Sequence, residues 1–186
     1  MSSFLQDEEG AYRERLLALL ERIPRGVPAG WERERYAVGG LRYIGFSAVQ
    51  TEKLICVSSQ GQRVIDCKTG EKLSCDGDFD EDSLIACAGL LGDELVPLAG
   101  EGGGALRRFG GAGDALDTAA PFWPREQVIF MPGFVSWYQN PEACAVIFDD
   151  YALRAFGFSR CGSYFAVACS HTLDIYRRTG ENALQN

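Results

Sequence analysis

An internal repeat constrains the fold of this chain more than any other feature of its sequence. Residues 41–71 run LRYIGFSAVQTEKLICVSSQGQRVIDCKTGE, and residues 153–181 run LRAFGFSRCGSYFAVACSHTLDIYRRTGE. Both copies begin with L-R-x-x-G-F-S, continue through a short apolar segment to a serine, and end with T-G-E. With two single-residue gaps, the matching positions are Leu41/Leu153, Arg42/Arg154, Gly45/Gly157, Phe46/Phe158, Ser47/Ser159, Ser59/Ser170, Ile65/Ile175, Thr69/Thr179, Gly70/Gly180 and Glu71/Glu181. The repeat therefore predicts that each copy forms the same small supersecondary structure.

Each copy has the pattern of three short strands joined by turns. The expected strands are 41–47, 53–59 and 62–67 in the first copy, and 152–158, 164–169 and 172–177 in the second. Gln60-Gly61 between two of them is a two-residue hairpin signal. The residues 54–57 are apolar at successive positions, which is typical of a strand covered on both faces.

Further strands are expected outside the copies. Residues 31–38 alternate large apolar and charged side chains at their start, as a half-exposed strand does. Short strands are also expected near 72–75, 127–131 and 143–148, the last forming a hairpin with 152–158 through Asp149-Asp150-Tyr151. Residues 84–91 fit either a buried strand or a short helix, and residues 92–120 are expected to be loop.

A helix is predicted over residues 8–23. An apolar stripe runs along one face at the spacing of a helix: Tyr12, Leu16, Leu19, Leu20 and Ile23. Asp7 is the expected N-cap, and Pro24 follows the predicted end. The stripe indicates packing against the chain's own sheet, with docking of a partner as the alternative.

The copies resemble one blade of a β-propeller of the tryptophan-aspartate-repeat kind. In the second copy the pattern is carried by Phe158, Ser159, Gly162, Tyr164, Phe165, Val167, Ala168, Leu173, Ile175 and Tyr176, and in the first by Phe46, Ser47, Leu54, Val57, Val64, Ile65, Asp66, Thr69 and Gly70. The resemblance covers about a third of the chain, and it implies a meandering antiparallel sheet packed on both faces and a binding role. Neither copy ends in Trp-Asp, and the offset from Arg42 to Arg154 is 112 residues, so the copies are not in tandem. With blades of about 40–45 residues, the chain is also short for a closed ring.

The expected fold is therefore mainly β, with antiparallel meander sheets in a pseudo-symmetric, propeller-like or sandwich arrangement and one N-terminal amphipathic helix. A single domain over 1–186 is expected. Its parts are the helix at 8–23, a first blade-like unit at 31–75, an irregular acidic and glycine-rich middle at 76–126, and a second blade-like unit at 127–180.

Charge and composition restrict the classes of partner. The net charge of −8 argues against nucleic acid and anionic membranes, which bind concentrated positive charge, and it leaves a basic protein as the expected partner. The acidic N-terminus lacks the layout of a signal peptide, and no apolar stretch is long enough to span a bilayer. Seven cysteines, an odd number, suit buried thiols in a reducing compartment. These features predict a cytoplasmic protein.

The densest negative charge lies at residues 76–82, with the sequence DGDFDED. Asp78, Asp80 and Asp82 are candidate binding residues there. Calcium prefers oxygen ligands at alternate positions, but position twelve of such a loop is Cys87 instead of the bidentate glutamate. The pattern favours a solvated acidic loop and no metal site.

The glycine-rich middle supplies the remaining candidate binding residues. Arg107 and Arg108 form an isolated basic pair, and Trp123 lies in the aromatic turn Pro121-Phe122-Trp123-Pro124. A phosphate-binding loop is not indicated, because no Gly-Lys-Ser/Thr follows the glycines. A loop of about thirty residues is unusual in a compact domain and is itself a candidate functional element.

No catalytic constellation is recognised in the sequence. The single histidine, His171, lies in a predicted hairpin turn, where a surface position is the favoured interpretation. No Cys-x-x-Cys occurs, so a zinc site is not expected. Asp149-Asp150 fits a hairpin turn better than a carboxylate pair for hydrolysis. No catalytic residue, metal or cofactor is therefore predicted.

The leading hypothesis is a small binding protein without enzymatic activity that docks on a basic protein, in the manner of an immunity protein neutralising a toxin. The alternative is a hydrolase or small-ligand-binding domain, with the loop 100–125 as a lid over a site near Arg107, Arg108 and Asp149. A third hypothesis is a structural part of a larger assembly, since an unpaired sheet edge invites association.

Overall fold

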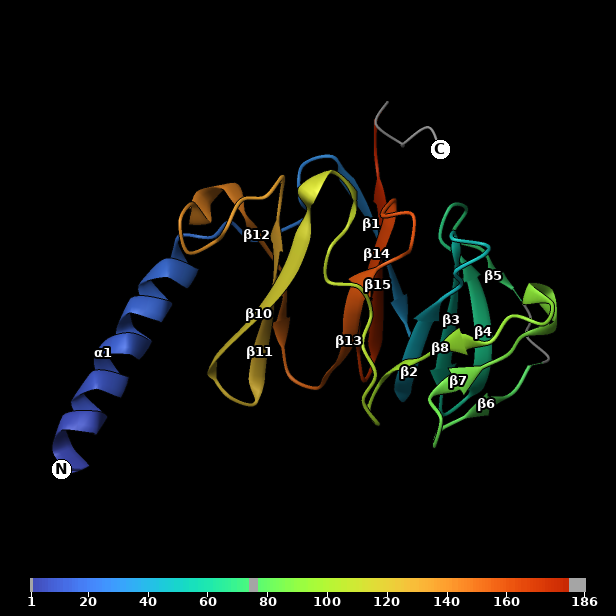
Figure 1. Ribbon diagram of the computed structural model, residues 1–186, viewed down its shortest axis with the longest axis horizontal. Helices are drawn as coiled ribbons and strands as arrows, with labels where there is room; N and C mark the ends of the chain where they lie inside the picture. The colour runs from blue at the N-terminus through green and yellow to red at the C-terminus, as the bar shows by residue number, and fades with distance from the viewer. Residues whose placement is uncertain (1, 74–76, 181–186) are drawn as a thin grey trace. The chain divides into compact units, whose positions relative to one another are not determined.

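The computed structural model describes residues 2–73 and 77–180, with side chains from residue 10 onward. Over this part of the chain the protein is mainly β, with four antiparallel sheets and one N-terminal α-helix, as the sequence predicts (Figure 1). The chain divides into two compact units. Unit 1 comprises residues 1–28 and 113–151, and unit 2 comprises residues 29–112 and 152–186. The prediction of a single domain over 1–186 stays a prediction.

The first copy of the repeat forms a sheet in unit 2. Its strands are β2 (Leu41–Phe46), β3 (Lys53–Ser58), β4 (Gly61–Asp66) and β5 (Lys72–Leu73), and β9 (Ala99–Gly100) pairs with the other edge of β2. Consecutive strands are neighbours, in the order β5-β4-β3-β2-β9. The three strands predicted for this copy are confirmed within a residue or two at their ends.

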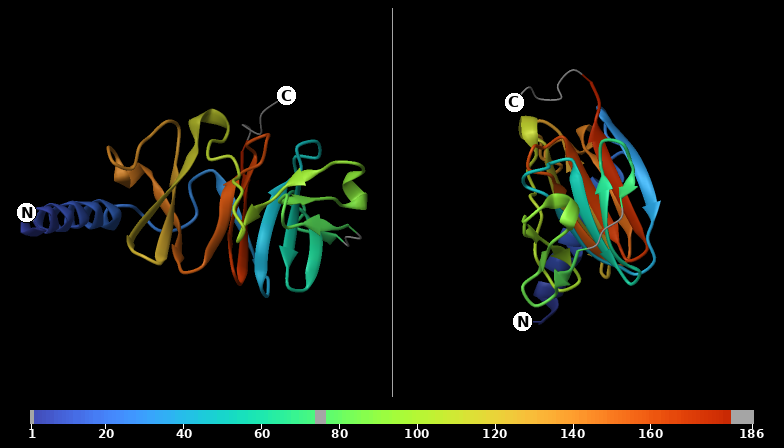
Figure 2. Two further views of the ribbon diagram at one scale, coloured as in Figure 1. Left: turned by 60° about the horizontal axis from the view of Figure 1, so that its bottom comes forward. Right: turned by 90° about the vertical axis from the view of Figure 1, so that its right-hand side faces the viewer.

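The second copy forms a matching meander, also in unit 2. It contains β13 (Leu153–Phe158), β14 (Tyr164–Cys169) and β15 (Thr172–Arg178). The strand β1 (Trp31–Ala37), which precedes the first copy in sequence, pairs with β15 of the second copy (Figure 2). In β1 the side chains of Trp31 and Tyr36 are buried and the charged residues between them are exposed, as the alternating pattern predicts.

The two copies pack on each other through one shared hydrophobic core. Ile44 and Leu54 of the first copy pack with Ala166, Ala168 and Ile175 of the second. The alanines lie on β14 and β2 approaches β13 and β14, so small side chains on one sheet accommodate branched side chains on the other. Figure 1 shows the two sheets side by side within unit 2.

A third, smaller sheet covers the other face of the first copy. It contains β6 (Phe79–Asp80), β7 (Ile85–Ala86) and β8 (Val96–Pro97), with a 3-10 helix η1 at Gly89–Leu91. Ile55 and Val57 of β3 pack in this second core, whereas Leu54 and Cys56 pack in the first. The prediction that 54–57 is covered on both faces is confirmed. The segment 84–91 contains both a short strand and a short helix.

Unit 1 consists of the helix and a three-stranded sheet. The helix α1 spans Ser2–Glu21, and the sheet has the order β10-β11-β12, from β10 (Ala115–Phe122), β11 (Arg125–Met131) and β12 (Ala145–Asp150). A short 3-10 helix, η3 (Pro141–Ala143), precedes β12, and another, η2 (Gly111–Gly113), precedes β10 at the boundary between the units in sequence. The core is centred on the buried Trp137, whose indole N–H donates a hydrogen bond to Asp117 at 2.9 Å.

The apolar stripe of the helix packs against this sheet. Leu20 and Ile23 are buried in the core of unit 1, and Leu16 and Leu19 pack beside them. Tyr12, the first residue of the predicted stripe, is instead 56% exposed. Because α1 begins at Ser2, Asp7 lies inside the helix and is not its N-cap. Packing on the chain's own sheet is thus confirmed for the C-terminal half of the stripe.

Two further expectations about the strands were wrong. Residues 115–122 form β10, although a loop was expected there. The segment ALDTAAPF has small and polar side chains without a strand pattern, and it becomes a strand because it pairs with β11. The expected hairpin of 143–148 with 152–158 does not form, since β12 pairs with β11 and β13 pairs with β14. Asp149 and Asp150 accordingly belong to strand β12 and not to a turn.

No helix in the described ranges has both the length and the apolar composition required to cross a bilayer.

Candidate functional site

Arg107 and Arg108 lie against the edge of the second-copy sheet in unit 2. The Arg107 carbonyl accepts the backbone N–H of Phe158 at 2.8 Å, and its guanidinium donates to the Arg160 carbonyl at 2.6 Å. The Arg108 guanidinium lies 3.7 Å from the ring centroid of Phe156. Both side chains therefore help to attach the segment before β10 to its own unit.

Asp149 and Trp123 belong to unit 1. The Asp149 carboxylate pairs with Arg25 and, at 2.8 Å, with Arg125. Its pKa is lowered, because these partners and Gln127 outweigh the burial that raises it. Trp123 lies in the turn between β10 and β11, next to a cis bond to Pro124, and its side chain is 75% exposed. Of these two residues, Trp123 presents its side chain at the surface.

The carboxylates of the acidic loop stabilise local turns. Asp80 accepts the backbone N–H of Asp82 at 2.9 Å and the hydroxyl of Ser83 at 2.8 Å, and these hydrogen bonds lower the pKa of Asp80. Asp78 accepts the N–H of Phe79. Asp78, Asp80 and Asp82 are all exposed, whereas Asp76 lies outside the described residues. Within the described ranges no three His, Cys, Asp or Glu side chains are arranged to hold a metal ion.

His171 lies in the turn between β14 and β15, as predicted, and is exposed. Its Nδ1 lies 3.4 Å from the Ser170 hydroxyl and 3.6 Å from Cys169 Sγ. Cys169 is itself buried in the sheet.

A cavity of about 920 Å³ opens in unit 2 where the ends of the two repeat copies meet. Four segments line it: 51–52 and 66–69 from the first copy, and 161–164 and 177–178 from the second. The first and third are the turns that follow F-S in each copy, and the second and fourth lead into T-G-E. Matching parts of the repeat therefore form the opposing walls of this cavity, which we call the repeat cavity.

Two charged side chains of the repeat cavity are held in place by internal partners. The Asp66 carboxylate accepts a hydrogen bond from the Lys53 ammonium at 2.6 Å and further hydrogen bonds from the backbone N–H groups of Lys68 and Thr69. Burial raises the pKa of Asp66, but these hydrogen bonds outweigh it and lower the pKa overall. Arg177 donates to the Lys68 carbonyl at 2.5 Å and to Glu32 at 2.6 Å. These contacts tie the first copy to β1 and β15.

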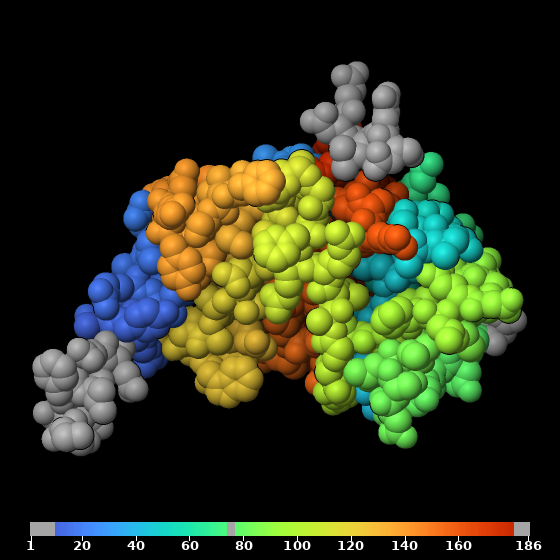
Figure 3. Space-filling view, in the orientation of Figure 1, coloured from blue at the N-terminus to red at the C-terminus, as the bar shows by residue number. Residues whose placement is uncertain are grey.

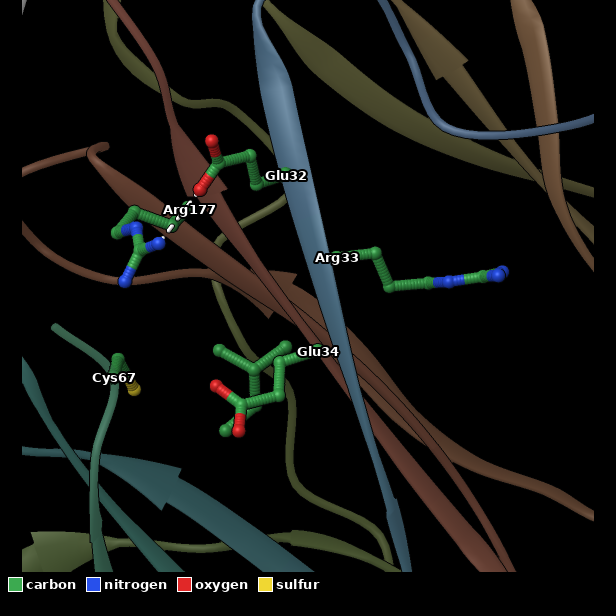
Figure 4. Close-up of a pocket in the computed structure, with 6 residues that line it drawn as sticks. Glu32, Arg33, Glu34, Cys67 and Arg177 are labelled. Atoms are coloured by element: carbon green, nitrogen blue, oxygen red, sulfur yellow. Dashed lines mark hydrogen bonds and ion pairs between the residues drawn. The ribbon is translucent and has the colours of Figure 1, made fainter. Parts of the chain in front are cut away.

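A smaller cavity of about 240 Å³ adjoins the first and shares Arg177 with it (Figure 4). Figure 4 shows the Glu32–Arg177 pair on one side, Glu34 directed toward the interior near Cys67, and Arg33 directed away. The Glu34 carboxylate lies so close to Gly70 that a Cβ there would meet its oxygen at 2.4 Å. Gly70 also has a φ of +77°, a conformation that favours glycine in the T-G-E turn.

Cys161 differs from the buried thiols of the protein. Burial raises the pKa of Cys56 to about 12 and that of Cys144 to about 11. Burial also acts on Cys161, but hydrogen bonds from the hydroxyls of Ser159, Thr51 and Ser163, and from a backbone N–H, lower its pKa overall. On this wall of the repeat cavity, Cys161 thus accepts hydrogen bonds from neighbouring hydroxyls.

Glu52, Lys68 and Arg178 complete the charged lining of the repeat cavity, and the Arg178 guanidinium lies 4.4 Å from the ring centroid of Trp31. Glu52 is half-buried and Lys68 is exposed, and neither side chain has a hydrogen bond or ion pair with the described part of the chain. Sequence reasoning assigned both to turns of the scaffold. A signal was available for Glu52, which lies in the turn after F-S where the two copies differ in sequence.

A second candidate surface lies on unit 1. Its exposed aromatic side chains are Tyr12, Phe122, Trp123, Phe134, Tyr138 and Tyr151, which we call the aromatic surface. The hairpin of β10 and β11 and the segment 132–144 are both at the surface of this unit (Figure 3).

The 67 residues of unit 1 include eleven acidic and five basic side chains, a net charge of −6. Unit 2 has fifteen acidic and thirteen basic side chains, a net charge of −2. Most of the protein's net negative charge therefore lies in the unit that carries the aromatic surface.

No protein-family model, no curated protein and no solved structure matches this chain. The candidate sites therefore rest on their own geometry. The repeat cavity combines opposite charges with hydrogen-bond donors, and the aromatic surface combines large exposed rings with negative charge.

Proposed function

We propose that this protein binds a basic, arginine-rich protein surface through the aromatic surface of unit 1. The observation that carries the proposal is the coincidence, in one small unit, of six exposed aromatic side chains with a net charge of −6. An arginine satisfies both features, because its guanidinium stacks on aromatic rings and pairs with carboxylates.

The individual contacts of the aromatic surface support an arginine partner. The Arg13 guanidinium of the protein's own helix lies 4.7 Å from the ring centroid of Phe122. Tyr12 and Tyr138 also lie together, since burial and a hydrogen bond with Tyr12 raise the pKa of Tyr138. Through its consecutive residues Tyr12 and Arg13, the helix thus contacts Tyr138 of the segment before η3 and Phe122 of the β10–β11 hairpin.

The exposure of these rings supports recognition over core packing. Trp123 is 75% and Phe134 is 90% exposed. Exposed large rings lose apolar hydration when a partner covers them, and tryptophan and tyrosine dominate the binding energy of many interfaces. A partner with complementary positive charge gains an increased association rate as well.

The role we propose is that of a binding protein without catalytic activity, comparable to an immunity protein that neutralises a basic toxin. The repeat sheets of unit 2 support this role, because they resemble propeller blades, which usually serve as binding scaffolds. The six described cysteines are free thiols, which supports a cytoplasmic location.

The proposal is tested with nona-arginine, nona-lysine and nona-glutamate peptides, by fluorescence anisotropy of labelled peptide. We expect nona-arginine to bind most tightly, nona-lysine more weakly and nona-glutamate not at all. Affinity should fall steeply between about 50 mM and about 500 mM salt, because the interacting charges are exposed. Trp123→Ala should weaken nona-arginine binding about tenfold or more.

The matched control is Phe109→Ala, which removes an exposed ring from unit 2 (70% exposed) and should leave binding unchanged. Equal binding of nona-arginine to the wild type and to Trp123→Ala contradicts the proposal. So does a concentration-dependent dimer in light scattering that Trp123→Ala abolishes, because a second copy then occupies the surface.

A further inference from the structure

We propose that the repeat cavity binds a small dipolar ligand of the α-amino acid kind, with its ammonium group at Glu52 and its carboxylate at Lys68. This inference concerns unit 2 and is independent of the protein-binding function proposed for unit 1.

The dimensions and rigidity of the cavity suit a small molecule. Its volume of about 920 Å³ is within the range of small-ligand pockets, about 300–1,000 Å³. Asp66 and Arg177 on its walls are each fixed by two or more hydrogen bonds. The hydrophobic core that the two copies share holds them together. A ligand therefore finds the walls already in position, which reduces the cost of binding.

The charges without internal partners define the ligand. Asp66 is neutralised by Lys53, and Arg177 by Glu32. Glu52 and Lys68 lack such partners in the described ranges. A carboxylate that is partly removed from water gains from a cationic group brought to it, because burial without a partner is costly. A ligand that carries both charges pairs with Glu52 and Lys68 together and adds no net charge.

A polar side chain of the cavity wall, Tyr164, can orient the bound ligand. The Tyr164 side chain is half-buried and borders the cavity, and its hydroxyl has no hydrogen-bond partner among the described residues. Burial raises the pKa of Tyr164, and the acidic groups of Cys67, Cys161 and Glu52 raise it further. The hydroxyl of Tyr164 thus offers a donor next to the place of the ligand's charged groups. Recognition of a small ligand commonly depends on a few such groups.

The experiment is isothermal titration calorimetry of the full chain with each common L-amino acid. For the tightest binder, the amine that lacks the carboxylate and the acid that lacks the ammonium are titrated next. We expect at least one amino acid to bind, and each analogue to bind about tenfold more weakly, because it leaves one charged group of the cavity unpaired. Glu52→Gln should weaken binding about tenfold and Lys68→Ala about fivefold.

The matched controls are Glu71→Gln and Arg63→Ala, which change exposed charges outside the cavity lining and should bind like the wild type. The inference is overturned if no amino acid binds at about 10 mM, ten times a 1 mM Kd. It is also overturned if the acid analogue binds as tightly as the amino acid, or if Glu52→Gln and Lys68→Ala bind normally. The analogue series keeps the test decisive should one variant not fold. A failure here leaves the peptide binding of unit 1 untouched, and the converse also holds.

Discussion

Unit 1 and unit 2 use their aromatic side chains in opposite ways. In unit 2, Trp31, Phe158, Phe165 and Tyr176 are buried together, with ring centroids of Trp31 and Phe165 4.6 Å apart and those of Phe165 and Tyr176 4.2 Å apart. In unit 1, Phe130 and Trp137 are buried, and six other aromatic side chains are exposed. Similar residue types thus stabilise one unit and remain available for contacts in the other.

The two units also differ in the balance of acidic and basic side chains. Acidic and basic residues are nearly balanced in unit 2, and many are paired, such as Arg35 with the buried Asp174 at 2.6 and 2.7 Å. The two residues lie directly opposite each other on β1 and β15. Unit 1 has a large excess of acidic residues. The comparison teaches that the net charge of the protein is concentrated in unit 1, whereas in unit 2 acidic and basic side chains nearly cancel.

The largest expected effect compares a buried ring with an exposed one. Phe165→Ala in unit 2 should lower the free energy of unfolding by about 4 kcal/mol, because it leaves a cavity among stacked rings. Phe134→Ala in unit 1 should change it by less than about 0.5 kcal/mol, since that ring is 90% exposed. Urea denaturation measures both. A loss above about 2 kcal/mol in Phe134→Ala would break the contrast between the units.

A smaller effect is expected from glycines with positive φ. Gly70→Ala in unit 2 should cost about 2 kcal/mol, because the φ of +77° is unfavourable for alanine and the new Cβ displaces the Glu34 carboxylate. Gly133→Ala in unit 1 has a φ of +51° with open space around it, so it should cost about 1 kcal/mol. Equal losses in urea denaturation would show that the Glu34 contact contributes nothing.

The smallest effect is a pH dependence at Asp66. Its pKa is lowered in the folded protein, so its stabilising contribution is fully present above the ordinary pKa of about 4 and is lost as the pH falls through the lowered value. Asp66→Asn should therefore be about 1 kcal/mol less stable than the wild type at pH about 6, and the difference should shrink as the pH falls through the lowered pKa.

Urea denaturation across this pH range measures the difference at Asp66. Asp82→Asn, at an exposed carboxylate of the acidic loop, is the control. Asp149 of unit 1 also has a lowered pKa, and Asp149→Asn should show the same sign of pH dependence. An equal loss of stability at all pH values would instead point to packing of the Asp66 side chain.

Much of the strand structure was predictable because it follows from local patterns. The three strands of each copy, and the exposed charges of β1, appear in the sequence as alternation, apolar runs and turn residues. The apolar stripe of α1 likewise predicted the packing of Leu20 and Ile23. The strand β10 was missed because its small side chains have no such pattern and its pairing comes from β11.

The sequence by itself determined that two similar three-stranded meanders form, since each depends on side chains close together in the chain. Only the tertiary structure decided that these meanders share one core, that β1 pairs with β15, and that Glu52 and Lys68 meet the second copy across a cavity. The physical reason is that periodicity reports which face of a strand is buried, but not which distant strand buries it. The repeat cavity depends on this pairing of distant strands, which the sequence pattern does not report.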